Sequence, residues 1–154
     1  LSKTAQQHPA NSMVHDWLGM ALIGQNKFEA ALATYRKAVK LSGGLAEIQG
    51  GLGHALAIAG QPLEAKQIAK QLEAATHRGH VPPVQIAFIY AGLGENGTAL
   101  DWLEKAAQEK AWELTFMRVE PWLDGLRDEP RFQAIETAMQ FPLSHANPPS
   151  RPPR

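Results

Sequence analysis

The 154-residue sequence predicts an all-α fold, a right-handed α-solenoid built from antiparallel helix pairs. Three observations predict it. One pattern of large and small residues recurs with a constant period of about 34 positions. Within each copy, the large residues are spaced so that they share one face of a helix. A turn residue recurs as well, at Asn26, Gly60 and Gly94, where a left-handed conformation would end a helix.

The recurring pattern has two parts, one for each helix of a pair. In the first part, a large residue precedes a small one, and a second large residue follows three positions later: Leu18-Gly19-x-x-Leu22, Leu52-Gly53-x-x-Leu56 and Ile86-Ala87-x-x-Tyr90. The second part reads Ala31-x-x-x-Tyr35-x-x-Ala38, Ala65-x-x-x-Ala69-x-x-Leu72 and Ala99-x-x-x-Leu103-x-x-Ala106. The small residues should let the two helices of a pair approach closely.

The predicted elements follow this period along the chain. Residues 1–11 are expected to be the end of a preceding repeat or an N-terminal cap. Helix pairs are expected near 12–24 and 27–41, 45–59 and 62–75, and 83–93 and 96–109, within repeats at 12–45, 46–79 and 80–113. After them the period should break. Residues 114–141 should form a capping element, with a short helix or turn near 114–119 and a last helix from about Asp128 to Gln140.

These columns resemble the tetratricopeptide repeat, which has a large-small-aromatic triplet on its first helix and Ala-x-x-x-aromatic-x-x-Ala on its second. The resemblance covers roughly residues 12–110. His15, Gln49 and Pro83 stand where the family often has Trp, and the aromatic residue of the second helix is kept only as Tyr35. The resemblance implies a module that binds another protein or peptide.

The stretch from Val81 to Phe132 is similar to the end of repeat regions carried by many bacterial signalling proteins. In those proteins, such repeats follow a kinase, a nucleotide cyclase or a winged-helix DNA-binding domain. This resemblance implies a bacterial source. It also implies an alternative function, as the regulatory arm of a larger signalling protein.

In a repeat fold of this type, function lies mainly on the concave face, which first-helix residues form. By spacing, that face should present Met13, Asp16, Met20 and Ile23, then Glu47, Gly50, His54 and Ile58, then Val81, Val84, Phe88 and Ala91. The set is mainly apolar with sparse acidic charge, so it should bind an apolar or amphipathic segment. It lacks the Lys, Arg and Asn with which members of the family grip a chaperone carboxylate. Alternatively, the apolar stripe packs against neighbouring repeats or the chain's own tail.

Composition narrows the function classes further. Lys plus Arg (15) balances Asp plus Glu (15), so a nucleic-acid partner is not expected. No apolar run approaches the roughly 20 residues that insertion into a membrane requires. The chain has no cysteine, which excludes thiol chemistry and leaves the compartment open between the cytoplasm, which we favour, and the periplasm.

No group of residues suggests catalysis or a bound cofactor. The sequence offers no nucleophile with a base in reach, so an enzyme is not expected. His77 and His80 form at most half of a metal site, and no metal is expected there.

The two ends leave further alternatives. Leu1 to Gln7 would end a helix whose partner is missing, and this uncovered end suggests a homo-oligomer. Residues 142–154 are rich in proline, which favours a linker or tail over a ligand for a proline-recognising groove.

Overall fold

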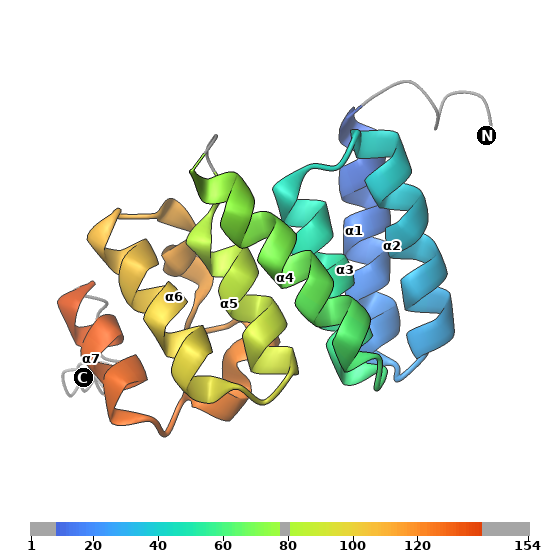
Figure 1. The fold of residues 1–154 in the computed structure, drawn as a ribbon. Coiled ribbons are helices and arrows are strands. Elements are labelled where there is room, and N and C mark those ends of the chain that lie inside the picture. The colour runs from blue at the N-terminus through green and yellow to red at the C-terminus, as the bar shows by residue number, and fades with distance from the viewer. Residues whose placement is uncertain (1–8, 78–80, 140–154) are drawn as a thin grey trace, which may run out of the picture.

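The computed structural model describes residues 9–77 and 81–139, and every regular element within them is helical (Figure 1). In chain order the elements are α1 (Pro9–Gly24), α2 (Phe28–Ser42), α3 (Ala46–Ile58), α4 (Pro62–Thr76), α5 (Pro83–Gly92), α6 (Asn96–Gln108), the 3-10 helices η2 (Trp112–Phe116) and η3 (Pro121–Leu126), and α7 (Pro130–Ala138). This arrangement confirms the predicted all-α solenoid. The first helix begins earlier than expected, at Pro9, inside the segment predicted to precede the first repeat.

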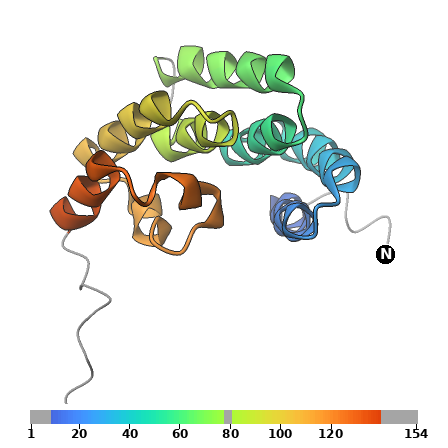
Figure 2. The same cartoon turned by 90° about the horizontal axis from the view of Figure 1, so that it is seen from below.

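The helices pack as successive pairs, α1 with α2, α3 with α4, and α5 with α6. The first helices also contact one another, α1 with α3 and α3 with α5, so each pair stacks on the next. Figure 2 shows the resulting curve, with α4 on its outer side and α1, α3 and α5 towards its inner side. The inner side is the concave face.

The turns within the pairs are alike, as the period predicts. Asn26, Gly60 and Gly94 all have positive φ, at 58°, 78° and 73°. After each of them, a backbone N–H donates back to a carbonyl in the last turn of the first helix, as from Lys27 to Leu22 at 2.9 Å. Equivalent bonds, also 2.9 Å long, join Gln61 to Leu56 and Glu95 to Tyr90. These bonds satisfy carbonyls that the helix end would otherwise leave unpaired.

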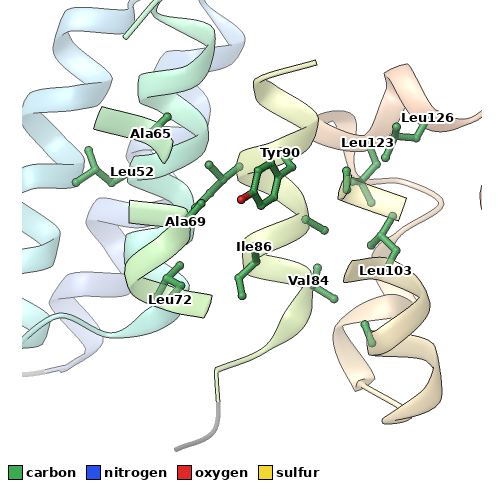
Figure 3. Packing of buried hydrophobic residues seen from close by; sticks show 14 of the residues in the cluster. Leu52, Ala65, Ala69, Leu72, Val84, Ile86, Tyr90, Leu103, Leu123 and Leu126 are labelled. Carbon is green, nitrogen blue, oxygen red and sulfur yellow. The ribbon is translucent and has the colours of Figure 1, made fainter. Parts of the chain in front are cut away.

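One continuous core runs through the array. Ala31, Ala65 and Ala99 occupy equivalent places and are fully buried. Figure 3 shows the packing, with Leu52 from α3, Ala69 and Leu72 from α4, Ile86 and Tyr90 from α5, Leu103 from α6 and Leu123 from η3. Because no pair buries its apolar face alone, the pairs stabilise one another.

The small residues of the pattern were expected to let the two helices of one pair approach closely, but not all of them lie at that contact. A Cβ added at Gly19 would lie 2.5 Å from the ring of Tyr35, so this glycine does allow the second helix of its own pair to approach. A Cβ at Gly53 would lie 2.6 Å from Ile89 and 3.4 Å from Ile68. The tighter contact is with α5, so Gly53 mainly accommodates the first helix of the following pair.

The last helix keeps the period, which was expected to break after residue 113. The second helices begin at Phe28, Pro62 and Asn96, and α7 begins one full period further on, at Pro130. It packs on α6 and buries Phe132 and Ile135. The helix starts later than Asp128 because Pro130 favours extended backbone at Glu129 and itself suits the first helical position.

The segment between α6 and α7 takes the place of a first helix but forms η2 and η3 instead. Pro121 cannot donate a backbone hydrogen bond and would break a helix here. The residue before it, Glu120, is extended, with φ −79° and ψ 110°. The segment therefore folds back, and η3 packs against α5 on the inner side of the curve (Figure 2).

Candidate functional site

The structure divides the predicted concave-face residues into a covered part and an open part. Gly50, His54, Val81 and Val84 are buried, with His54 only 4% exposed and Val84 2%. Met13 and Glu47 are exposed, and the remaining predicted residues are partly buried: Asp16, Met20, Ile23, Ile58, Phe88 and Ala91. The expectation that the whole set is presented to a partner is wrong for the buried four.

Trp122 of η3 covers part of this face. Its ring stacks on the imidazole of His54, with ring centroids 4.2 Å apart and planes 16° apart. It meets the ring of Phe88 edge to face, at 5.1 Å. Met20, His54, Phe88 and Trp122 are each one full period apart in the sequence, so Trp122 extends a row of equivalent positions. The capping segment therefore packs against this part of the apolar stripe, whereas the sequence had suggested neighbouring repeats or the tail for that place.

His54 has a structural role in this arrangement. Its Nδ1 donates a hydrogen bond of 2.8 Å to the carbonyl of Phe88, which joins α3 to α5. A Cβ at Gly92 would lie 2.8 Å from the same nitrogen, so only glycine leaves room for the ring. Burial lowers the pKa of His54 to about 4, although the bond to Phe88 acts in the opposite direction. The imidazole is therefore neutral at physiological pH.

Arg127 holds the folded-back segment in shape. Its guanidinium donates to the carbonyls of Arg118 and Glu120, at 2.6 Å and 3.2 Å, and to the carboxylate of Asp124 at 2.7 Å. The carboxylate of Glu120 accepts a further bond from the backbone N–H of Trp122 at 3.2 Å. Sequence reasoning missed Trp122 and Arg127. The spacing of one period from Phe88 was the one signal that could have identified Trp122.

Tyr35 extends from the outer helix α2 to a buried position between α1 and α3. Its ring passes between Gly19 of α1 and Gly51 of α3, and a Cβ added at either glycine would lie 2.5 Å from the ring. The added Cβ at Gly51 would also lie 3.1 Å from Oδ1 of Asp16. Two glycines thus admit an aromatic ring whose far end lies beside an acidic group.

The charges of two carboxylates from other elements act on Asp16 of α1: Glu47 of α3, and Glu120, which directly precedes η3. Burial raises the pKa of Asp16 to about 6, and the charges of Glu120 and Glu47 add to the effect, while the Tyr35 hydroxyl opposes it. The pKa of Glu120 is raised too, mainly by burial. Asp16 and Glu47 form no ion pair with any residue that the structure describes. Asp16 and Glu47 therefore make this part of the face acidic.

A second exposed feature lies on α1. Met13, Val14, Trp17 and Leu18 are between 47% and 62% exposed, although all four are large and apolar. Helical spacing places them on one broad side of the helix, away from the buried Gly19. Neighbouring apolar residues exposed together mark an interaction surface more often than scattered ones do.

Within residues 9–77 and 81–139, no group of three His, Cys, Asp or Glu side chains is arranged to hold a metal ion. His80 and the proline-rich residues 142–154 lie outside the described residues, as do Leu1 to Gln7. The helices that the structure describes are too short or too polar to cross a lipid bilayer.

Residues 14–44, which hold most of α1, all of α2 and the turn that follows, match the family model of the tetratricopeptide repeat. Neither the curated proteins nor the solved structures give a match to the chain.

Proposed function

We propose that this chain, a tetratricopeptide repeat protein, binds an apolar or amphipathic segment of another protein on the open part of its concave face. Tetratricopeptide repeats in general form a non-catalytic scaffold for protein-protein interaction. The observation that carries the proposal is the division of the concave face. Trp122 covers His54 beside Phe88, whereas Asp16, Met20 and Glu47 keep exposed surface.

The open part suits a peptide for two reasons. Met20 and Ile23 offer partly exposed apolar side chains, and methionine adapts its shape to different partners. Met13 extends this surface along α1. The helices beneath are braced by the core, so a partner would meet a preformed surface and lose little free energy in ordering it.

Selection of peptides tests this proposal. Peptides that bind the immobilised protein are selected from a random phage-display library. Calorimetry then measures the affinity of the selected peptides for the parent protein and for Met20→Gln. We expect Met20→Gln to weaken binding at least about tenfold, because it places a polar group against an apolar contact. Leu63→Gln is the matched control, since Leu63 is 78% exposed on α4, outside the concave face. If Met20→Gln binds the selected peptides as tightly as the parent does, the proposed site is refuted.

A second candidate function is self-association through α1. The exposed side chains of Met13, Val14, Trp17 and Leu18 favour it, because water contact with this much apolar surface is unfavourable. Light scattering over a range of protein concentrations tests it. A mass that rises with concentration, and that Trp17→Gln/Leu18→Gln returns to one chain, supports a homo-oligomer. A single-chain mass at every concentration rejects it.

The regulatory-arm alternative stays a prediction from the resemblance of residues 81–132. The expected lack of a nucleic-acid partner, of a cofactor and of catalysis stays a prediction in the same way.

A further inference from the structure

One side of α1 has the spacing of a buried helix face, although it is exposed. Val14, Trp17, Leu18 and Ala21 lie three or four positions from one another, so they share one side of the helix. The first three are 56%, 62% and 47% exposed, and Ala21 is exposed as well. These four residues are called the α1 edge below. Figure 2 shows that α1 lies at one end of the curve.

The equivalent positions of the following two pairs are all buried. One period after the α1 edge they are Ile48, Gly51, Leu52 and Ala55. Two periods after it they are Pro82, Gln85, Ile86 and Ile89. The second helix of the preceding pair contributes to this burial, since α2 packs on α3 and α4 packs on α5.

Gly51 shows the contact directly, because an added Cβ there would lie 2.5 Å from the Tyr35 ring of α2. Within residues 9–77 and 81–139, α1 is the first helix, so no second helix of a preceding pair lies on it. The α1 edge therefore has the residue pattern of a surface that a helix covers in the rest of the array.

Trp17 specifies the residue that such a helix would place against it. At the equivalent position α3 has Gly51, which faces the large Tyr35 of α2. One period later α5 has the larger Gln85, and α4 has the smaller Ala69 where α2 has Tyr35. A larger residue on the first helix thus goes with a smaller one on the second, because close packing tolerates neither overlap nor voids. A helix on the α1 edge needs alanine or glycine opposite Trp17.

The other residues of the α1 edge specify the remaining chemistry of the partner. Val14, Leu18 and Ala21 are apolar, so the partner helix needs apolar residues at matching spacing and polar residues on its other side. No lysine or arginine lies on α1, so the edge offers no positive charge for an acidic partner. Tryptophan is among the residues that contribute most to binding at interfaces, and Trp17 lies within the edge.

We infer that the α1 edge binds an amphipathic helix of another protein, in the place that α2 takes on α3, with an alanine or glycine of that helix against Trp17. This surface adjoins the concave face, and the inference does not rest on the peptide site proposed there. A second copy of the chain would compete for the same residues, and the mass of the free chain separates the two occupants.

The α4 segment of this chain serves as the probe, because α4 packs on α5 and carries Ala69 at the place that would meet Trp17. A peptide of residues 61–77 is held helical by a hydrocarbon staple on its exposed side and carries a fluorophore. Fluorescence anisotropy measures its binding to the full chain. A second peptide carries Ala69→Tyr. We expect the parent chain to bind the first peptide at least about fivefold more tightly than the second.

Trp17→Ala should reverse this preference. The variant makes room for a tyrosine and leaves a gap opposite an alanine, so the Ala69→Tyr peptide should bind it about threefold more tightly than the unchanged peptide does. A purely apolar attraction would instead favour the Ala69→Tyr peptide on both chains, because tyrosine adds apolar area. Trp112→Ala is the matched control, since Trp112 is 69% exposed on η2. It should keep the preference of the parent.

Two results would overturn the inference directly. One is a preference that stays the same in Trp17→Ala, and the other is no binding of either peptide at concentrations up to about 1 mM. Light scattering on the free chain gives a third test. A dimer that Trp17→Ala returns to a single chain would assign the α1 edge to a second copy, and would overturn a helix of another protein as its occupant.

A pair of variants separates the α1 edge from the concave face. Leu18→Gln should weaken binding of the helical peptide and leave the peptides selected for the concave face unaffected, because Leu18 belongs to the edge. Met20→Gln should do the reverse. A helical peptide whose binding is lost in Met20→Gln and kept in Leu18→Gln would belong to the concave face, and would overturn the edge as its site.

Discussion

Trp122 and His54 form a stacked pair that joins the capping segment to the second repeat, with ring centroids 4.2 Å apart. The two residues lie on separate elements, η3 and α3, and four other elements lie between these two in the chain: α4, α5, α6 and η2. The pair closes part of the concave face and leaves the rest, around Asp16, open. The proposed site is therefore bounded by the protein's own aromatic residue.

Replacing Trp122 by alanine should destabilise the protein by about 2 kcal/mol, because the contacts with His54 and Phe88 are lost. Urea denaturation measures the change. Trp112→Ala is the control, since Trp112 is 69% exposed and should contribute little. Equal effects of the two changes would show that the stacked pair contributes little stability.

His54 should make stability depend on pH between about 4 and 6.5. The folded protein holds its pKa at about 4, below the ordinary value of 6.5, so the unfolded state binds the proton more tightly. Its contribution is complete above 6.5 and is lost as the pH falls, by up to about 3 kcal/mol.

Asparagine is the variant for this test, because its amide can still donate to the carbonyl of Phe88. The free energy of unfolding of His54→Asn, relative to the parent, should improve steadily as the pH falls from 6.5 to 4. A constant difference over that range would show that His54 titrates normally in the folded protein.

The ionisation of Asp16 should make stability fall as the pH rises, which is opposite to the effect of His54. Its pKa is raised from 3.8 to about 6, so the folded state binds the proton more tightly, and the ionised carboxylate lowers stability at neutral pH. Asp16→Asn should therefore stabilise the protein at pH 7.5 by on the order of 1 kcal/mol, allowing for solvent screening. The gain should nearly vanish at pH 4, where the parent is already protonated. Asp128→Asn should show no such dependence, and a gain for Asp16→Asn that is equal at both pH values would contradict the raised pKa.

A pair of glycine changes tests the close packing around Tyr35. Gly19→Ala should destabilise the protein by about 1–3 kcal/mol, since the new methyl group would lie 2.5 Å from a fully buried ring. Gly97→Ala should be neutral or stabilising by about 0.5 kcal/mol, because Gly97 is helical and nothing lies within 4 Å of its added Cβ. Thermal or urea denaturation measures both. If the two changes alter the free energy of unfolding similarly, helix propensity and not the contact with the Tyr35 ring determines the effect at Gly19.

The helices and their turns could be predicted from the sequence because their causes are local. Asn26, Gly60 and Gly94 end helices through their own backbone conformation, and the apolar spacing of each helix is visible within a few turns. Ala31 and its equivalents in the next two pairs are buried as the pattern predicted. Each of these features depends on residues that are neighbours along the chain.

The concave face could be predicted only in part, because its exposure depends on distant contacts. Met13 and Glu47 are exposed as expected, but His54 is covered by Trp122, which follows it much later in the chain. Spacing along one helix says which side a residue faces. It does not say which other segment will lie against that side.

By itself, then, the sequence determined the helix pairs, their period and their turns, since hydrogen bonds and apolar spacing within a few residues are sufficient for these. Tertiary structure alone decided that Trp122 packs on His54 and that Tyr35 passes between Gly19 and Gly51 to reach Asp16. Such contacts depend on how whole helices stack, because burial and charge act between residues that are close in space and far apart in sequence.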